Sequence, residues 1–547
     1  MKEENKPIYQ LISTWERVLI TVIVMLGAFM AILDTTIVDI IVPKITAPLK
    51  TDLYGVQWVI TAYMMASATM LILAQWLDKN FGLRNVYIFG VALFTVSSFA
   101  CGMSDNLDSM IGARIFQGMG EAFIMATAQA ILFAVYPPEK KGLAMGIFGL
   151  GVSFAPSLGP TLGGYITEYI NWRWVFFINI PFGILTVLLA VFYLPETSMI
   201  REKTRLNFVS FGFLSLFTIT TLVILSKGQQ LGWFMSDLIV YLTVVAVFSL
   251  LFYILSELVS KNPLIDFSIF KIKEYFVGFS IFFLLLGFSM YQVFYLLPLY
   301  FERLKGLSTF DAGLHILAFA VFIAIFSPIA GILSDKIGEK KVLYAAVVVY
   351  LISSLYFLPR LEYFTPNIQA AVMTIPLGIA LGMFFAPVTT LALRKLGDKT
   401  SLGTGLLHYS RFIGGSFGTA IATNDLYRFG YEHFEGVNNT QSYSYINYVY
   451  HKLTSVFSHI TFPENAEKLA LAVIYKLQYL YSMNWSFQDT FFVAGLYGLL
   501  GSMPVLILIY YDLFVRKKNE YPQKILAGCF DRNFVCSRIS YDIQKIK

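Results

Sequence analysis

The sequence predicts an all-α polytopic membrane protein, and two observations predict this class. Of the 547 residues, 57% are hydrophobic and only 14% are charged, whereas roughly a quarter are charged in a soluble domain. Apolar stretches of about 20 residues, the length a helix needs to cross the hydrocarbon of a bilayer, recur along the chain. One aqueous core could not bury this much apolar surface, so the bilayer is expected to act as the solvent.

Fourteen such stretches follow one another, and each is expected to form one transmembrane helix. Their approximate limits are 18–42, 54–77, 85–103, 108–135, 142–166, 174–194, 207–226, 238–258, 276–300, 312–333, 341–359, 367–393, 403–425 and 487–514. The first stretch is longer than the apolar core of a signal peptide, and no small-residue cleavage site follows it. It is therefore expected to remain in the protein as the first span.

The distribution of Lys and Arg among the short loops predicts the orientation, because cytoplasmic loops carry an excess of these residues. If the N-terminus lies in the cytoplasm, the cytoplasmic short loops hold sixteen Lys and Arg residues and the opposite loops hold seven. Both termini are therefore expected in the cytoplasm. The net charge of +6 follows from this bias and indicates no nucleic-acid binding.

The stretches and loops predict the division of the chain into parts. These parts are a cytoplasmic N-terminus (1–17), an N-terminal six-helix bundle (18–194), a linker with two extra transmembrane helices (195–275), a C-terminal six-helix bundle (276–514) and a cytoplasmic tail (515–547). The tail is basic, so anionic lipid is expected to attract it. One external loop, 426–486, is long, polar and rich in Tyr and Asn. It is expected to be a flexible connector, or else a docking surface or a lid.

Two short segments resemble each other, and each follows an apolar stretch and opens a basic loop. The first contains Asp78, Gly82 and Arg84, and the second contains Gly331, Asp335, Gly338 and Lys340. In both, the Asp at the helix end can meet the positively polarised N-terminus of the next helix, and the Gly permits a tight turn. Such a repeat predicts two related halves around a central path.

The second segment, residues 331–341, resembles the cytoplasmic-loop motif of the major facilitator superfamily, G-x-L-x-D-x-x-G-x-[RK]-[RK]. The resemblance implies a major facilitator fold of two six-helix bundles, to which this chain adds two central helices. It also implies that the loop residues of both segments form a gate on the cytoplasmic side. The first segment has one extra residue between its Asp and its Gly, which leaves its geometry open.

The fifth stretch carries small residues at every fourth position, namely Gly151, Ala155, Gly159 and Gly163. Such a ridge lets another helix approach closely, and Pro160 favours a bend. Together with Gly164, these residues resemble the G-P-x-x-G-G motif of exporters in the superfamily, which implies outward transport. Either the ridge only packs helices, or it forms a hinge between two moving halves.

Charged residues inside the spans are candidates for a functional site, because a charge at the bilayer centre costs about 2.5–3.5 kcal/mol on insertion scales. Asp34 lies in a segment that resembles the L-D-x-T-V-V-N-V-A-L-P signature of fourteen-span drug:proton antiporters, the EmrB/QacA-like branch. The resemblance implies proton or cation coupling by Asp34, and the alternative is an Asp that packs the helix through hydrogen bonds. Asp39 replaces the Asn of the signature and is either a second functional carboxylate or a solvated helix end.

Arg114, Gln117 and Glu121 lie in the fourth stretch. The segment from Arg114 resembles the superfamily motif R-x-x-Q-G-x-G, to which proton transfer in exporters is assigned. A buried Arg would hold a nearby carboxylate ionised, and loss of that contact would let the carboxylate take up a proton. Glu121 lies two helical turns beyond Arg114 on the same face. It is expected to bind a proton or a substrate cation, or else to line the path as a structural acid.

Arg411 and His408 lie in the thirteenth stretch. The segment from Arg411 to Gly418 resembles the R-x-x-G-G-x-x-G stretch of EmrB-like proteins. Arg411 is a candidate coupling or substrate residue, and the alternative is an Arg that anchors backbone carbonyls. His408 is expected to be a structural histidine, with a proton relay as the alternative.

Several motifs of other classes of protein are missing from the sequence. No G-x-x-x-x-G-K-[ST] loop, H-E-x-x-H motif or metal-spaced Cys/His cluster occurs, so neither ATP hydrolysis nor a metal site is indicated. No enzyme activity is expected. No cofactor is expected either, because a proton gradient would drive the protein.

The resemblance implies a proton-coupled exporter of hydrophobic or cationic small-molecule drugs in the bacterial inner membrane. Its implied partners are the drugs, protons, membrane lipid, a periplasmic adaptor (EmrA-like) and an outer-membrane channel, and no nucleic acid. Two alternatives stay open. One is a facilitator-type transporter of a specific metabolite on the same scaffold, and the other is a membrane receptor or scaffold without turnover.

Overall fold

The computed structural model describes residues 7–196, 204–440, 443–460 and 462–510. In this part of the chain the secondary structure is helical and no strand occurs. Residues up to Gly501 belong to one compact unit, and a second unit begins at Ser502. The expected tail, 515–547, lies outside the described residues.

The N-terminal part of the chain forms helices that match the first six expected stretches. They are α1 (Ile8–Leu11), α2 (Thr14–Ile45), α3 (Leu53–Leu71), α4 (Ala74–Phe81), α5 (Leu83–Met103), α6 (Leu107–Val135), η1 (Pro138–Lys140), α7 (Lys141–Tyr169), α8 (Trp174–Phe177) and α9 (Asn179–Tyr193). Polar side chains fix several starts, because they accept hydrogen bonds from backbone N–H groups that have no partner within the helix. Ser13 caps α2, Asp52 caps α3 and Asn106 caps α6. We call α2–α9 the N-terminal bundle.

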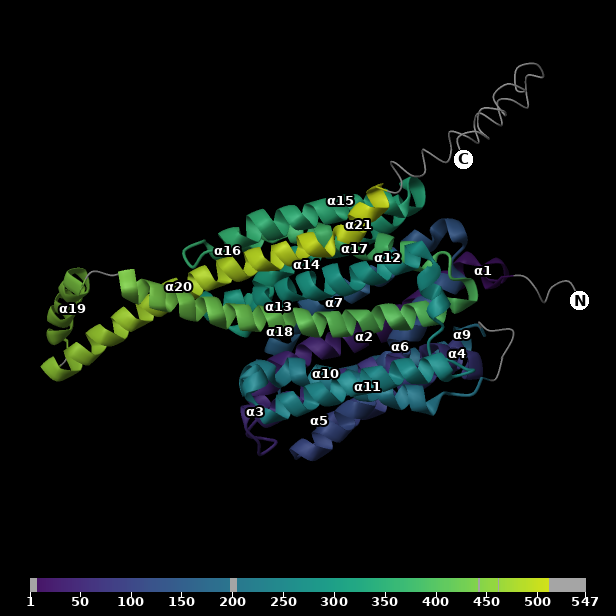
Figure 1. The fold of residues 1–547 in the computed structure, drawn as a ribbon, viewed down its shortest axis with the longest axis horizontal. Coiled ribbons are helices and arrows are strands. Elements are labelled where there is room, and N and C mark those ends of the chain that lie inside the picture. The colour runs from purple at the N-terminus through teal and green to yellow at the C-terminus, as the bar shows by residue number, and fades with distance from the viewer. Residues whose placement is uncertain (1–6, 197–203, 441–442, 461, 511–547) are drawn as a thin grey trace, which may run out of the picture. The chain divides into compact units, whose positions relative to one another are not determined.

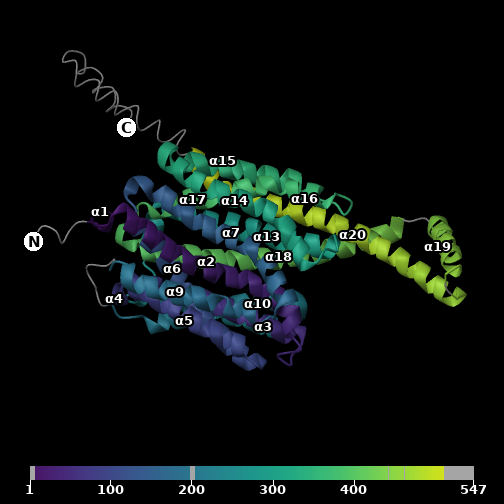
Figure 2. The same ribbon diagram turned by 180° about the vertical axis from the view of Figure 1, so that it is seen from behind.

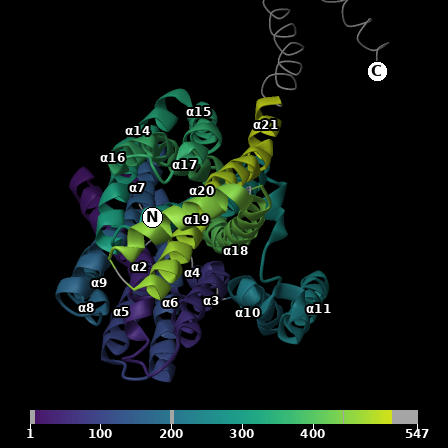
Figure 3. The ribbon, with the colours of Figure 1, turned by 90° about the vertical axis from the view of Figure 1, so that its left-hand side faces the viewer.

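The two extra stretches form a helical hairpin. It consists of α10 (Phe208–Leu231), η2 (Trp233–Met235), α11 (Asp237–Val259) and the short η3 (Phe267–Lys271). Gly232 ends α10 with a φ of 75°, the left-handed conformation that glycine adopts without strain. In α11 only 22% of the most apolar window is buried, against 89% in α6, so most of α11 is free to face lipid. In Figure 3, α10 and α11 lie side by side next to α3 and α18.

The C-terminal part is also helical over the described residues. Its elements are α12 (Lys273–Ile281), η4 (Phe282–Met290), α13 (Tyr291–Leu299), η5 (Tyr300–Leu304), α14 (Thr309–Ile337), α15 (Glu339–Ile352), η6 (Ser353–Phe357), η7 (Leu358–Arg360), α16 (Asn367–Met373), α17 (Ile375–Leu393), η8 (Gly397–Lys399), α18 (Thr400–Thr440), α19 (Tyr443–Ser458) and α20 (Pro463–Gly501). The elements η4, η5 and η6 are π-helical. The second unit contains α21 (Met503–Tyr510). We call α12–α20 the C-terminal bundle.

Eleven described helices are long and apolar enough to cross a membrane, or up to thirteen if each of two bent pairs forms one span. The bend between α3 and α4 is 58°, and the bend within α7 is 42°. The expected stretch 403–425 is the one that this test does not recover. It forms the first part of the 41-residue α18, and it contains His408, Arg411 and several Gly, Ser and Thr residues, which keep its own hydropathy low. The number fourteen therefore stays a prediction.

The segment 426–486, expected to be a loop, is mostly helical. α18 continues to Thr440, α19 follows, and α20 begins at Pro463. In Figures 1 and 2, α19 and the first part of α20 extend beyond the ends of the neighbouring helices. The low hydropathy of this segment indicates exposure to water, which does not prevent a polar sequence from forming a helix.

Candidate functional site

A buried ion pair joins α2 to α6. The Nη1 atom of Arg114 donates to Oδ2 of Asp34 over 2.5 Å, and the side chains of both residues are at most 1% exposed. Arg114 lies on α6, the most deeply buried of the long helices, where bulk water cannot screen its charge. The sequence predicted that these two residues belong to one site, and the structure brings them into direct contact.

The second carboxylate oxygen of Asp34 is held by two amides. Asn179 of α9 and Gln117 of α6 donate to Oδ1 over 2.8 and 3.0 Å. Gln117 also accepts from Arg114 and donates to Ser98 of α5. Three helices of the N-terminal bundle therefore meet at Asp34, and α5 joins them through Ser98. Both oxygens of Asp34 have partners, as a buried charge requires.

Arg114 has further partners on α3. Its Nε atom donates to the carbonyl oxygen of Val59 over 3.2 Å. Its guanidinium carbon lies 4.0 Å from the ring centre of Tyr63, within the range of a cation–π contact. These contacts keep Arg114 in place independently of Asp34, so a change at the carboxylate does not by itself release the Arg.

A second cluster of polar residues links the two bundles, and several of its hydrogen-bonding groups have no partner among the described residues. Glu121 of α6 and Arg411 of α18 are buried, and the charge of Arg411 acts on Glu121. Glu121 Oε2, Arg411 Nε and both ring nitrogens of His408 have no hydrogen-bond partner among the described residues. Such groups are rare in folded proteins and call for an explanation, for which a bound solute is one candidate.

His408 is fully buried and lies at the seam between the bundles. Its ring centre is 6.1 Å from that of Phe148 on α7, and Phe148 in turn contacts Phe385 on α17. His408 therefore combines an aromatic neighbourhood with two unpaired nitrogens.

The glycines after Arg411 explain how α18 packs. A Cβ atom on Gly414 would come within 2.6 Å of the carbonyl oxygen of Phe283, and one on Gly418 would collide with that of Gly287. The π-helical η4 and α18 therefore approach backbone to backbone. This close packing fixes the position of Arg411 one helical turn before Gly414.

The small residues of α7 face two directions. Gly151, Gly159 and Gly163 pack against Met25, Thr36 and Ile37 of α2, within the same bundle. Ala155 is fully buried. Gly164 instead faces Phe310 of α14 at 3.4 Å, across the seam. The predicted ridge is therefore mainly a contact with α2, while other faces of α7 contact the C-terminal bundle.

The α7–α14 seam is closest at the end where α7 begins. Asp335 accepts hydrogen bonds from the backbone N–H groups of Gly142 and Leu143, over 2.8 and 2.9 Å. A Cβ atom on Gly142 would lie 2.5 Å from the carbonyl oxygen of Gly331. The expectation that Asp335 meets the next helix is therefore wrong. Asp335 meets the N-terminus of α7, which lies almost two hundred residues earlier in the chain.

The first copy of the repeat also joins the two bundles, but here the Asp belongs to the N-terminal bundle and its partner to the C-terminal bundle. Asp78, near the end of α4, accepts a 2.5 Å hydrogen bond from Ser401 in the first turn of α18. Each Asp therefore joins one bundle to the start of a helix of the other. Gly82 and Gly338 have φ values of 80° and 96°, which confirms that the two turns need glycine.

The basic residues of the two repeats have different roles. Arg84 donates to the carbonyl oxygen of Val191 on α9, within its own bundle. The positive charge of Lys340 attracts the carboxylate of Glu274 on α12.

The linker is tied to the start of α18 by an ion pair at the same end. Lys399 Nζ lies 2.5 Å from Asp266 Oδ2 and donates to Ser268. Partial burial acts to raise the pKa of Asp266, but the hydrogen bonds from Lys399 and Ser268 outweigh it and lower this pKa to about 2.

Two predicted site residues cannot be placed. In addition, the structure shows four residues at these contacts that the sequence did not predict. The side chains of Asp39 and Pro160 lie outside the described residues. Sequence reasoning gave no role to Asn179, Ser98, Tyr63 or Ser401, because it started from charged groups in the spans and from a few motifs, such as the one that contains Gln117. Polar residues within apolar stretches were the available signal. Among the described residues, no group of His, Cys, Asp and Glu could hold a metal ion.

Comparison with known proteins gives consistent matches. A family model described as Major Facilitator Superfamily matches residues 24–419. The multidrug export protein EmrB of Escherichia coli is 31% identical over 411 residues, which cover 74% of this chain and 79% of that protein. The riboflavin transporter RibZ of Clostridioides difficile is 34% identical over 405 residues, which cover 74% of this chain and 87% of that protein.

Among solved structures, the proton:xylose symporter XylE bound to 6-bromo-6-deoxy-D-glucose has a TM-score of 0.56. The match covers 92% of this chain and 97% of XylE at 14% sequence identity, so it shows a common fold and nothing of the substrate.

Proposed function

The chain belongs to the major facilitator superfamily, and we propose that it exports hydrophobic or cationic small molecules in exchange for protons. It is a membrane transporter and not an enzyme. The observation that carries the proposal is the Asp34–Arg114 pair, a buried carboxylate in contact with one guanidinium. The similarity to multidrug exporters of the EmrB type supports the direction of transport.

Asp34 is the proposed proton site. While Arg114, Gln117 and Asn179 donate to it, the carboxylate is stabilised in its ionised form. A shift of α2 relative to α6 that lengthens the contact to Arg114 would leave a buried charge unpaired, which favours proton uptake. Proton entry can then drive transport, since each pH unit supplies about 1.4 kcal/mol and each 100 mV about 2.3 kcal/mol.

Glu121, Arg411 and His408 are the proposed cargo groups. They belong to opposite bundles, so a solute bound between them senses the relative position of both. Glu121 would attract a cationic group. The Phe148 ring next to His408, together with the Phe385 ring that contacts Phe148, suits an apolar or aromatic body. Because Glu121 has a single carboxylate, a proton and a cargo cation would be alternative partners for it, and the charge of Arg411 disfavours binding of both at once.

Alternating access would proceed by relative motion of the bundles. The contacts of Asp335 with α7 and of Asp78 with α18 hold one end of the seam closed. We place this end in the cytoplasm, together with both termini, and the protein in the bacterial inner membrane. The bend in α7, next to the Gly159–Gly164 segment, is the proposed hinge.

Partners beyond the membrane form a further part of the proposal. On the side away from Asp335, the extended helices of residues 426–486 offer a surface for a periplasmic adaptor, which would connect the transporter to an outer-membrane channel. Deletion of residues 443–458 should then abolish co-purification with an adaptor but spare flux in liposomes.

Export of one specific metabolite is a second candidate, because the riboflavin transporter RibZ is as similar to this chain as EmrB is. Proteoliposomes with an imposed pH gradient decide between the two. Gradient-driven movement of several unrelated lipophilic cations supports multidrug export. Movement of a flavin alone would support the specific transporter, and no movement of either compound would contradict the proposal.

A further inference from the structure

A cavity of about 210 Å³ lies where both bundles meet α10. Its lining comes from α3, α10, α13 and α18, and its polar members are Thr61, Ser226, Gln229, Tyr295, Ser416, Thr419 and Thr423. No charged side chain is among the described residues that line it, and no residue of the Asp34 or Glu121 clusters contributes. This cavity, with its uncharged polar lining, therefore differs in chemistry from the proposed transport site, which contains charged residues.

The helix α10 closes this cavity on the side of the hairpin, because it is bonded to both bundles. Ser226 lies 3.1 Å from Thr61 of α3, oxygen to oxygen, and Thr218 lies 2.8 Å from the hydroxyl of Tyr409 on α18. The hairpin thus covers the seam between α3 and α18.

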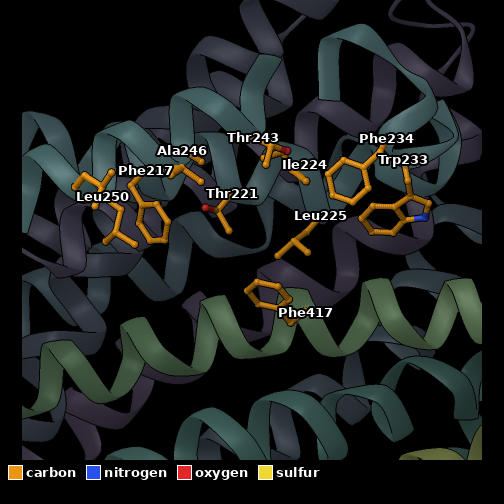
Figure 4. Close-up of a pocket in the computed structure, with 12 residues that line it drawn as sticks. Phe217, Thr221, Ile224, Leu225, Trp233, Phe234, Thr243, Ala246, Leu250 and Phe417 are labelled. Atoms are coloured by element: carbon orange, nitrogen blue, oxygen red, sulfur yellow. The ribbon is translucent and has the colours of Figure 1, made fainter. Parts of the chain in front are cut away.

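A second cavity, of about 350 Å³, lies on the other side of α10, between α10, η2, α11 and α18. Its lining is apolar apart from the hydroxyls of Thr221 and Thr243 and the indole of Trp233 (Figure 4). In Figure 4, Phe417 of α18 points toward Leu225 of α10. Leu225 lines both cavities, so its side chain stands between the apolar space and the hydroxyl-lined space.

The hydroxyls of the smaller cavity are available mainly as acceptors. Thr61 donates its hydrogen to the carbonyl oxygen of Gln57, Thr419 to that of Ser416, and Thr423 to that of Thr419. A hydroxyl that donates to its own helix keeps its lone pairs for another partner. The cavity is therefore suited to a ligand that brings its own hydrogen-bond donor.

The charge next to this cavity disfavours a cationic ligand. Lys227 adjoins Ser226, is buried, and donates to Gln57 over 2.6 Å. Asp52 attracts the charge of Lys227, but no carboxylate is among the described residues that line the cavity itself, so none is there to offset a second positive charge. An alcohol or an amide N–H satisfies the acceptors without this repulsion.

We propose that the two cavities form one lateral port between the bilayer and the α3–α18 seam. The port takes uncharged amphiphiles, with the apolar body beside Trp233 and Phe417 and a hydroxyl or amide head at Thr61 and Thr419. The inference rests on the proposed transport function. It adds a route of entry from the bilayer and a class of cargo that takes this route. Leu225 has to turn aside for passage.

Photolabelling in nanodiscs tests the port without any proton gradient. The probe is a medium-chain alcohol that carries an alkyl diazirine, and its methyl ether and its trimethylammonium analogue serve as reference probes. We expect the alcohol to label peptides of α10 and α18, and labelling to fall about five-fold for each hydrogen bond lost in Thr61→Val and Thr419→Val. The control Thr220→Val removes a hydroxyl that donates to Leu216 on the same helix but lines neither cavity, and it should change nothing.

A filling variant separates the port from general loss of structure. Leu225→Trp should block labelling, whereas Leu255→Trp, on an exposed position of α11, should not. Equal labelling by the alcohol and its ether, or labelling unaffected by Leu225→Trp, would show a lipid-filled surface and overturn the inference. Transport of lipophilic cations is measured separately in the same variants, so failure of the export proposal leaves the labelling result interpretable.

Discussion

The carboxylate of Asp335 accepts a 2.8 Å hydrogen bond from the backbone N–H of Gly142, across the seam between the two bundles. The partner is the positively polarised start of α7, where an anion is stabilised. Asp78 makes a different contact at the start of α18, since it accepts from the side-chain hydroxyl of Ser401 and not from backbone N–H groups. Two carboxylates, one from each bundle, therefore join the bundles at this end of the seam.

Asp335→Asn should shift the protein toward the state open at this end. The amide keeps the shape of the side chain, but it loses the charge and presents an N–H₂ group to one of the two backbone donors. A charge-assisted hydrogen bond contributes about 1.5–3 kcal/mol, so the closed fraction should fall roughly ten- to a hundred-fold relative to the open one. Spin-label distances between α7 and α14 measure the shift. Asp398→Asn, which changes an exposed carboxylate near the start of α18, is the control, and equal distances in both variants would refute the role of Asp335.

Gly142→Ala should have a similar effect by steric means. The new methyl group would lie 2.5 Å from the carbonyl oxygen of Gly331 and 2.6 Å from Oδ1 of Asp335, so the seam has to widen. We expect the closed state to lose about 1–3 kcal/mol, as for other overpacked sites. Gly112→Ala is the matched control, since nothing lies within 4 Å of its Cβ position. It should stabilise α6 by about 0.5–1 kcal/mol, and an identical response of the two variants in accessibility labelling would contradict the close contact.

Glu121→Gln should lower the transport of cationic compounds much more than the transport of neutral compounds. Removing the charge eliminates the attraction for cations but leaves the size of the side chain and the aromatic residues near His408 unchanged. Losing one partner of a buried charge pair costs about 2–5 kcal/mol, so transport of lipophilic cations should fall at least ten-fold while that of neutral compounds persists. Counterflow in proteoliposomes measures both classes, with Glu139→Gln as a surface control. A parallel loss of both classes would assign Glu121 to folding or to proton transfer instead.

His408→Leu should increase stability and decrease transport. Both ring nitrogens of the buried His lack described partners, and an unsatisfied buried polar group costs about 1–3 kcal/mol, which the apolar side chain removes. Thermal unfolding in detergent tests the first effect, and flux tests the second. His433→Leu provides the contrast, because it breaks a 2.6 Å contact with Asp489 and should destabilise the protein. If His408→Leu also lowers the unfolding temperature, His408 is a packing residue.

Much of the fold follows from hydropathy, because a helix needs about 20 apolar residues to cross the bilayer. The apolar stretches predicted α2, α5, α6 and the α10–α11 hairpin closely. Hydropathy could not predict that α18 and α20 continue far beyond the apolar region, since water allows polar helices of any length.

The site was predictable where charge identified it. Asp34 and Arg114 were both assigned to the site because charges in a span need partners, although the sequence did not show that they pair with each other. Asn179 was missed because a neutral amide in an apolar stretch gives a weak signal. The partner of Asp335 was unpredictable in principle from local sequence. It comes from a helix of the other bundle, and only the tertiary arrangement brings the two together.

Proton movement driven by cargo in Asp34→Asn proteoliposomes tests the central claim most directly. Wild-type protein should release protons into a weakly buffered medium when a lipophilic cation is added to one side. Asp34→Asn keeps the shape of the side chain but has no titratable group, so it should bind cargo and move no protons. Cargo-driven proton movement at the wild-type rate in Asp34→Asn would contradict proton exchange at the Asp34–Arg114 pair.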